Sequence, residues 1–343
     1  MKHSNISIFV PHVGCPHLCA FCDQRTISGA QKAPTDDEVR LICEKALSEV
    51  SSFDNTEIAF FGGSFTAINR EYMVSLLKAA SEFVGNGRFK GIRISTRPDY
   101  IDDEILDILK GYGVTSIELG AQSLDDEVLF ANERGHTAQD IFDASALIRK
   151  RGFELGLQLM VGLYKTDKEI EYSNMQKVID ISPDTVRIYP VVILKGTKLA
   201  EYLLSGEYAP MPMSDVISVS SDMLLEFENA GIKVIKCGLH ASEFVERDMV
   251  GGFYHPAFRE LCESEIYKKQ FESKLQCKGI DTLTNTKKLI AVFSVNERNI
   301  SKAYGHKKSN SIYFKNHNID IKVTKDKDIH GYMCELKEVS TCT

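Results

Sequence analysis

The sequence predicts an α/β protein: a partial (β/α)6 parallel barrel with a small C-terminal α+β extension. Strand-like segments alternate with helix-like segments between residues 5 and 193, the pattern of parallel strands joined by right-handed crossovers. Six of these strands end in glycine or polar residues. Because ligands bind at the carboxyl ends of parallel strands, six converging ends favour a barrel over a doubly wound sheet.

The alternation rests on specific patterns. Thr35 and Glu38 form a capping box at the start of a helix, and Met73, Leu76 and Leu77 mark the apolar face of the next one. The expected strands cover 5–11, 57–63, 91–96, 115–122, 153–162 and 184–193. The expected helices cover 35–51, 69–84, 102–112 and 167–181, and a helical region at 125–151 is split near Gly135.

The alternation of strands and helices changes after residue 195. This suggests three parts: a barrel (1–208), an extension packed on it (209–284) and a small basic α+β module (285–343). In the extension we expect a helix at 214–230, a strand at 232–239 and a helix at 259–276. In the module we expect strands at 288–294, 311–315 and 319–324, with a helix at 297–304 and a basic turn at 305–310.

The amino-acid composition limits the classes of protein to which the chain can belong. The 343 residues are 43% apolar and 26% charged, which excludes collagen, coiled coils and a disordered tail protein. The longest apolar run, near 155–163, is too short to span a membrane, and no secretory leader is evident, so we expect a cytoplasmic protein without a membrane partner. Nine cysteines in such a protein are not a disulfide framework.

Charge is distributed unevenly. Residues 268–343 carry 15 Lys and Arg against 8 Asp and Glu, a net charge of +7, whereas residues 1–267 carry −14. A basic segment on an acidic body indicates either an anionic partner or a lysine-rich solvated surface.

Three cysteines follow the first strand in the spacing C-x3-C-x2-C: Cys15, Cys19 and Cys22. Structural zinc requires four ligands, and His12 or His17 could supply the fourth. A [4Fe–4S] cluster normally takes four thiolates, so three leave one iron open for a substrate such as S-adenosylmethionine (SAM).

This cysteine segment on the first loop of a parallel barrel resembles the radical SAM superfamily. The resemblance implies a [4Fe–4S] cluster that cleaves SAM reductively to give a 5′-deoxyadenosyl radical, and the three cysteines as its ligands. It also implies a set of SAM contacts at the strand ends: Phe21, Gly62, Gly63, Ser64, Arg97, Gln122, Arg134, Met160 and Gly162. Phe21 can equally be a core residue, and Arg134 a solvated one. Ser64 departs from the family pattern, in which glutamate commonly follows the Gly pair.

Four segments narrow the resemblance to the radical SAM half of Elongator protein 3: TRPDYID (96–102), ELGAQS (118–123), RGHT (134–137) and 183–208. The coproporphyrinogen oxidase barrel is a more distant resemblance. The sequence has tighter cysteine spacing than Elongator protein 3 and no R/Q-x-x-G-x-G/A acetyl-CoA loop, so acetyl transfer is not carried over.

Candidate substrate contacts lie beyond the sixth strand. Lys195 and Lys198 stand at the barrel mouth, and His240 and His255 occur in a segment where they are either relays or structural residues. Lys307 and Lys308 could contact an RNA backbone, or they could belong to a packing module unrelated to RNA.

We therefore expect a radical SAM enzyme that modifies a transfer-RNA base, served by an electron donor such as flavodoxin or ferredoxin. One alternative is the same chemistry on a porphyrin-like molecule or another metabolite. The other is a zinc-stabilised RNA-binding protein without catalysis.

Overall fold

The computed structural model describes residues 4–11, 15, 18–23, 32–240 and 242–341. The chain forms two compact units. The barrel unit comprises Met1–Met211, Ile232–Lys236 and His240–Tyr254, and the C-terminal unit comprises Pro212–Gly231, Cys237–Leu239 and His255–Thr343. The histidines proposed as zinc ligands, His12 and His17, lie outside the described residues.

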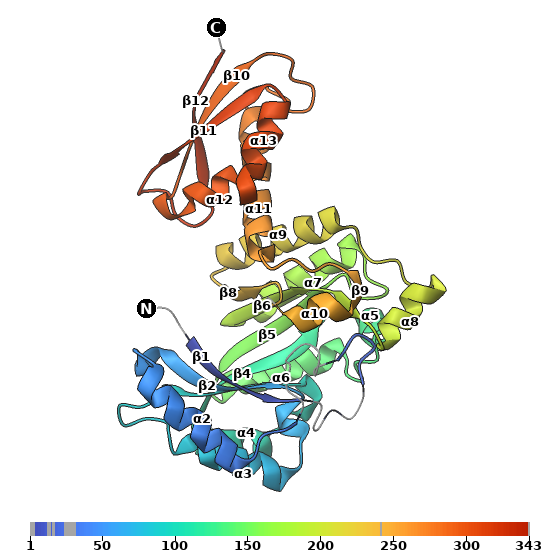
Figure 1. Ribbon diagram of the computed structural model, residues 1–343, viewed down its shortest axis with the longest axis vertical. Helices are drawn as coiled ribbons and strands as arrows, with labels where there is room; N and C mark the ends of the chain where they lie inside the picture. The colour runs from blue at the N-terminus through green and yellow to red at the C-terminus, as the bar shows by residue number, and fades with distance from the viewer. Residues whose placement is uncertain (1–3, 12–14, 16–17, 24–31, 241, 342–343) are drawn as a thin grey trace. The chain divides into compact units, whose positions relative to one another are not determined.

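The barrel unit is built on a seven-stranded sheet whose strands follow one another in chain order (Figure 1). Neighbouring strands from β1 to β6 run parallel, with Ile8 opposite Phe60 and Ile94 opposite Ile117. The strands are β1 (Ser4–Val10), β2 (Thr56–Gly62), β3 (Gly91–Thr96), β4 (Val114–Gln122), β5 (Glu154–Val161), β6 (Thr185–Pro190) and β8 (Lys233–Cys237). The partial parallel barrel predicted from the sequence is thus confirmed, and the strand expected at 232–239 is its seventh member.

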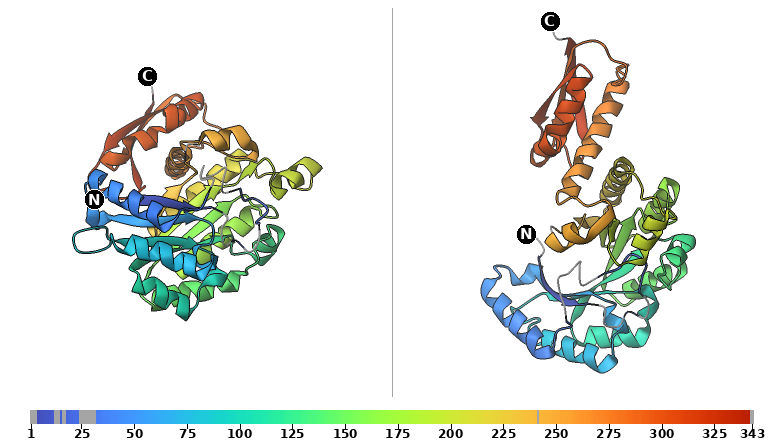
Figure 2. Two further views of the ribbon diagram at one scale, coloured as in Figure 1. Left: turned by 60° about the horizontal axis from the view of Figure 1, so that its bottom comes forward. Right: turned by 45° about the vertical axis from the view of Figure 1, so that its right-hand side comes forward.

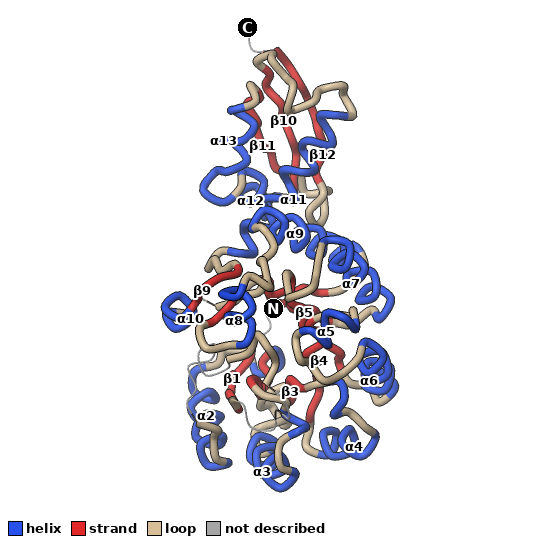
Figure 3. Tube along the Cα trace, turned by 90° about the vertical axis from the view of Figure 1, so that its right-hand side faces the viewer, coloured by secondary structure: helices blue, strands red, loops and turns tan. Residues whose placement is uncertain are grey.

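Helices cover the outer side of this sheet, as Figures 2 and 3 show. They are α2 (Asp36–Glu49), α3 (Arg70–Ser81), α4 (Asp103–Gly111), α5 (Asp126–Ala131), α6 (Ala138–Lys150) and α7 (Lys168–Ile181). Helix α8 (Lys198–Ser205) lies instead near the cysteine segment, where the Leu199 N–H donates to Ala20 O. The starts of the outer helices follow from capping residues in the sequence: Thr35 and Glu38 form the expected capping box, and Asp102 and Asp167 cap α4 and α7.

The inner face of the sheet is polar. Side chains alternate along a strand, so Ile92 and Ile94 of β3 lie on one face and Arg93 and Ser95 on the other. All four are buried, because helices cover one face and the curved sheet encloses the other. The polar residues of the inner face extend toward the carboxyl ends of the strands.

Three further short elements belong to the barrel unit. Strand β7 (Val192–Leu194) pairs antiparallel with β9 (Met249–Gly252), which follows helix α10 (Glu243–Asp248). No helix within the described ranges is long and apolar enough to cross a membrane.

The C-terminal unit contains two long helices, α9 (Met213–Asn229) and α11 (Phe258–Gln276), and a three-stranded sheet of order β11-β10-β12. Its remaining elements are β10 (Leu289–Val295), α12 (Ile300–Tyr304), α13 (Ser309–Asn316), β11 (Ile319–Lys325) and β12 (Cys334–Thr341). Strand β10 is parallel to β11 and antiparallel to β12. The predicted three-part division stays a prediction.

One expected strand in this unit is wrong. Residues 311–315 form part of helix α13, although Ile312, Tyr313 and Phe314 are residue types that favour strands. Phe314 is buried, with its ring centroid 6.0 Å from that of Phe271 on α11, whereas Ile312 is exposed. Packing of one helical face on α11 therefore overrides the local preference.

Candidate active site

A pocket opens at the carboxyl ends of the strands in the barrel unit. Its cavity volume is about 70 Å³, and the pocket is open to solvent on one side. Its lining is Cys15, Leu18, Cys19, Cys22, Gly63, Ser64, Ser95, Thr96, Arg97, Gly120, Arg134 and Gln158. Seven of these residues come from the set that the sequence assigned to a cluster or to SAM.

The cysteine segment is held from several sides. The Ala20 N–H donates to Asn132 O across 3.1 Å, and the Leu199 N–H donates to Ala20 O across 2.7 Å. Cys19 and Cys22 pack against an apolar cluster that includes Phe21. These contacts join the segment to the loop after β4 and to the start of α8, so three thiols face one pocket.

Burial and cations act on these thiols in opposite directions. Burial raises the pKa of Cys15, while the Ser64 backbone N–H, Arg134 and Arg97 lower it in part. Burial, together with Cys19 and Cys15, also raises the pKa of Cys22 well above its ordinary value. Both thiols are therefore neutral at pH 7, and ligation of a metal would release their protons.

Arg134 reaches the thiols directly. Its Nη1 donates to Cys19 Sγ across 3.0 Å, and its Nη2 donates to Gly120 O. Its guanidinium carbon also lies 6.0 Å from the centroid of the Phe21 ring. Arg134 is buried, so its charge acts on the cysteines with little screening by solvent.

The Gly-Gly-Ser segment after β2 brings backbone close to β1. Gly62 has a φ of +113°, and a Cβ at this position would lie 2.9 Å from Val10 O. The Gly63 N–H donates to that same carbonyl across 2.8 Å. Ser64 is buried, and its Oγ lies 2.9 Å from Thr96 Oγ1 and accepts from the Arg97 N–H across 3.1 Å. The serine at this position therefore links the ends of β2 and β3.

Arg97 lines the pocket and is hydrogen-bonded to a carboxylate of the same chain. Its Nε and Nη2 donate to the two carboxylate oxygens of Asp99 across 2.9 and 2.7 Å. Such paired contacts fix the plane of a guanidinium. The orientation of Arg97 in the pocket is thus set by a residue two positions further along the chain.

The other predicted SAM contacts lie around the pocket and are not part of its lining. Phe21 is buried, Met160 packs on the same apolar cluster, and Gln122 has a φ of +67° where β4 is irregular against β5. The Gly162 peptide is held on both sides: its N–H donates to Glu171 Oε1 across 2.8 Å, and its carbonyl accepts from the Tyr208 hydroxyl.

The predicted substrate contacts are not part of the pocket lining either. Lys198 forms an ion pair with Glu133, and the exposed Lys195 donates its backbone N–H to Asp248 O across 2.8 Å. His240 is exposed in the barrel unit, with Nδ1 3.2 Å from Lys236 Nζ. His255, Lys307 and Lys308 belong to the C-terminal unit, where the His255 ring centroid lies 5.5 Å from that of His306.

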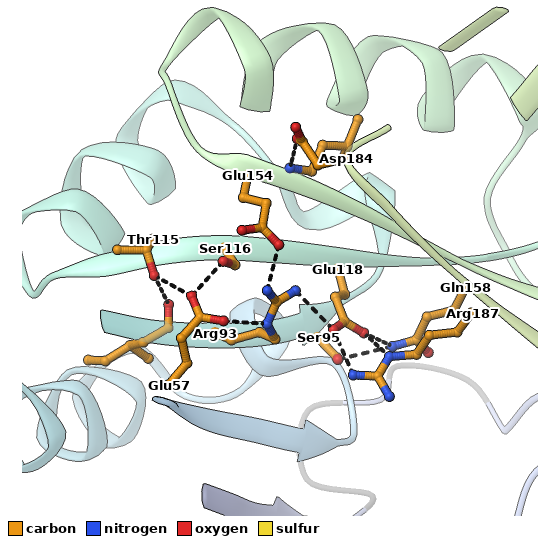
Figure 4. A network of polar contacts seen from close by, with 12 residues as sticks. Glu57, Arg93, Ser95, Thr115, Ser116, Glu118, Glu154, Gln158, Asp184 and Arg187 are labelled. Atoms are coloured by element: carbon orange, nitrogen blue, oxygen red, sulfur yellow. Dashed lines mark hydrogen bonds and ion pairs between the residues drawn. The ribbon is translucent and has the colours of Figure 1, made fainter. Parts of the chain in front are cut away.

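The sequence analysis missed a buried polar network beneath the pocket (Figure 4). Arg93 donates to Glu57 across 2.8 Å and to Glu118 across 3.1 Å, and Arg187 donates to Glu118 through two contacts of 2.6 and 2.8 Å. Burial alone would raise the pKa of Glu118, but Arg187 and Arg93 hold it below its ordinary value. The sequence did contain a signal for this network. Along each buried strand, the charged residue alternates with neighbours that lie on the opposite face.

Gln158 connects this network to the pocket. Its Nε2 donates to Glu118 Oε2 across 2.9 Å and to Ser95 Oγ across 3.1 Å, and both Gln158 and Ser95 line the pocket. The pocket floor is therefore polar and held in place by charge-assisted contacts.

Two more buried groups lie close by. His136 is buried, and burial together with Arg134 and Arg97 lowers its pKa to about 3, so it is neutral at pH 7. Glu171 is buried on α7, and burial raises its pKa to about 7. His136 lies in the RGHT segment that the sequence analysis quoted without assigning it a role.

The pocket fits an iron–sulfur cluster by its donor chemistry. Thiolates are the usual ligands of such clusters, and Arg134 and Arg97 would offset their charge. Among the described residues, no three His, Cys, Asp or Glu side chains are close enough to share a single metal ion. The three thiols that line the pocket would be the residues to hold such a cluster.

Two family models match the chain. The radical SAM superfamily model matches residues 9–173, and the radical SAM C-terminal domain model matches residues 183–268. The chain belongs to the radical SAM superfamily. It is therefore an enzyme, and the interpretation as a non-catalytic zinc protein is not supported.

The relatives include Elongator protein 3 and related tRNA-modifying proteins. A tRNA uridine(34) acetyltransferase of Methanocaldococcus jannaschii is 30% identical over 186 residues, which is 48% of this chain and 34% of that protein. The chain thus spans about a third of that relative's length. An uncharacterized protein of the same organism is 31% identical over 228 residues, 62% of this chain and 68% of that protein.

A solved structure shares the fold. The archaeal Methanocaldococcus infernus Elp3, with its N-terminus deleted, has a TM-score of 0.53 and 21% sequence identity. The match covers 71% of this chain and 61% of the other. The identity is low, so this likeness shows the fold alone.

Proposed function

We propose that this radical SAM enzyme modifies a base of transfer RNA, with Cys15, Cys19 and Cys22 holding a [4Fe–4S] cluster. The observation that carries the proposal is the pocket itself, which three thiols share with Gly63, Ser64, Arg97 and Arg134 at the carboxyl ends of the strands. When bound, the cluster supplies the electron that cleaves SAM to a 5′-deoxyadenosyl radical.

The chain's own residues would bind and orient the cluster and SAM and shield them from water. Arg134 donates to Cys19 Sγ, and its charge favours the thiolate forms that iron requires. Gly63 presents backbone to the pocket, while Arg97, oriented by Asp99, leaves the rest of its guanidinium for a carboxylate such as that of a methionine. The apolar cluster around Phe21 excludes water on one side.

The choice of transfer RNA rests on the relatives. Those named as tRNA uridine(34) acetyltransferase and Elongator complex protein 3 match about half of this chain. A buried base cannot reach a barrel interior while it is stacked, so the target base must be unstacked first.

Transfer-RNA dependence tests this function. Anaerobically reconstituted full-length protein is mixed with SAM, dithionite and unfractionated tRNA, and both 5′-deoxyadenosine and the digested nucleosides are analysed by mass spectrometry. We expect tRNA to stimulate 5′-deoxyadenosine formation and a nucleoside of new mass to appear.

The control pair is Cys19→Ala and Cys277→Ala, because Cys277 is an exposed thiol of the C-terminal unit. The first variant should lose both products, and the second should keep them. SAM cleavage that ignores tRNA but responds to a porphyrin or another metabolite would overturn the proposed substrate.

A further inference from the structure

The basic turn at residues 305–308 joins two helices in a βααβ arrangement. Strand β10 leads into α12, the turn follows, and α13 leads into β11, which lies parallel to β10. Tyr304, the last residue of α12, accepts a hydrogen bond at its Oη from the Val323 N–H of β11 across 3.1 Å. The Tyr304 side chain therefore links the end of α12, directly before the turn, to β11.

The backbone of this turn is specific. Gly305 has a φ of +84°, and a Cβ there would lie 2.3 Å from Ser309 Oγ and 2.8 Å from Asn310 N. Lys307 and Lys308 also have positive φ, +51° and +63°. The Lys308 N–H closes the turn on Gly305 O across 2.9 Å. The fourth residue thus adopts a conformation that glycine takes most readily.

Contacts on both sides anchor the turn. The His306 N–H donates to Ser264 Oγ across 2.8 Å, and its Nδ1 lies 2.8 Å from Glu260 Oε2. Asn310 is buried and donates through Nδ2 to Ser264 O across 2.9 Å and to Ala303 O across 3.1 Å. Helix α11 therefore fixes the residues before and after the two lysines.

The two lysines differ from the cations around them. Lys302 donates to Glu263 across 3.1 Å, and His306 contacts Glu260, so both have acidic partners. Lys307 and Lys308 are exposed, and neither ammonium group forms a hydrogen bond or ion pair with a residue in the described part of the chain. Two adjacent positive charges are thus held outward on an ordered turn.

We propose that the turn Gly305–Lys308 binds the phosphate backbone of a single-stranded RNA segment. RNA-binding domains of the KH class hold backbone nucleotides against a Gly-x-x-Gly loop. Here the loop is Gly-His-Lys-Lys, and Lys308 has the positive φ that suits the second glycine. The two outward ammonium groups supply the positive charge that binds phosphates.

This inference rests on the proposed RNA substrate, and it assigns the recruiting surface to the C-terminal unit. Because the turn is already ordered, RNA binding there costs little conformational entropy.

The test measures binding by the full-length protein to a fluorescein-labelled, unstructured RNA oligonucleotide, with fluorescence anisotropy over a range of salt concentrations. The test variant is Lys307→Gln/Lys308→Gln. The matched control is Lys287→Gln/Lys288→Gln, an adjacent pair of exposed lysines before β10 in the same module. Both variants lose the same charge on exposed positions.

We expect the test variant to bind on the order of tenfold more weakly, since two exposed ionic contacts are lost. Its plot of log affinity against log salt should be shallower by about 1.4, at about 0.7 for each single-strand phosphate contact. The control variant should retain both affinity and slope.

Equal weakening of the two variants, or unchanged affinity in the test variant, would overturn the proposal. Tighter binding of duplex RNA than of the single strand would also contradict it. These measurements need no cluster or SAM, so they fail or succeed separately from tRNA modification: normal binding without a modified nucleoside would refute only the proposed function.

Discussion

Arg134 donates from Nη1 to Cys19 Sγ across 3.0 Å, although the two residues lie 115 positions apart in the chain. The same guanidinium donates to Gly120 O at the end of β4. One side chain therefore connects the cysteine segment after β1 to a strand end three strands away in the sheet.

This contact predicts how tightly the protein holds iron. In Arg134→Gln a charge-assisted contact worth about 1.5 kcal/mol is lost, so the chelator concentration that removes half the iron should fall about tenfold. The measurement is iron release followed by visible absorbance, with Arg149→Gln on the exposed side of α6 as the control. Equal iron retention in both variants would contradict a role for Arg134 at the thiols.

Glu171 predicts a pH-dependent stability. Burial raises its pKa to about 7, so between about pH 4.5 and 7 the folded protein keeps a proton that the unfolded chain has lost. Its contribution to stability is therefore greatest at low pH and falls as the pH rises through that window, by about 3 kcal/mol in all.

Glu171→Gln keeps an acceptor for the Gly162 N–H and should remove this part of the pH dependence. Urea unfolding at several pH values checks it. Glu169→Gln, an exposed neighbour on α7, should leave the profile unchanged. If Glu171→Gln has the wild-type slope between pH 5 and 7, Glu171 does not titrate as described.

The buried network predicts a strong effect of removing Arg93. Its guanidinium contacts Glu57, Glu118 and Glu154 across 2.8, 3.1 and 2.6 Å. Arg93→Met leaves buried carboxylates without their cation and should lower the free energy of unfolding by about 3–5 kcal/mol. Glu154→Gln, at a partly exposed position, should have a much smaller effect; similar values for the two would mean that the network adds little.

Gly62 predicts a backbone requirement next to the cysteines. With a φ of +113° and Val10 O 2.9 Å from the position of a Cβ, Gly62→Ala strains the end of β2 and should lower the free energy of unfolding by about 1–3 kcal/mol. Gly111→Ala is the control, because no atom outside its own helix lies within 4 Å of its Cβ position. Thermal unfolding compares them, and a neutral Gly62→Ala would show that the two strands move apart easily.

Much of the fold and part of the site could be predicted from the sequence, because the residue patterns that determine them lie close together in the chain. The cysteines lie within eight residues, and Gly63, Ser64 and Arg97 directly follow strands, so the barrel topology alone brings them together. Arg134 was identified only through the family resemblance, since its contact with Cys19 depends on a bend after β4.

The remaining site residues depend on which face of a strand turns inward. Ser95 lies on β3, where every residue is buried, so burial alone does not show that Ser95 faces the pocket. The strand predicted at 311–315 was wrong for a related reason: burial of Phe314 against Phe271 decides the structure of this segment. Both errors concern contacts made between distant parts of the chain.

The most direct test of the account is the metal content and SAM chemistry of the full-length protein. After anaerobic reconstitution, iron, sulfide and zinc are counted, and 5′-deoxyadenosine is measured with dithionite and SAM. We predict about four irons per chain, as in a [4Fe–4S] cluster, and 5′-deoxyadenosine formation, both lost in Cys19→Ala and kept in Cys277→Ala. Bound zinc without SAM cleavage, or full activity in Cys19→Ala, would contradict the central claim that these three thiols hold the cluster.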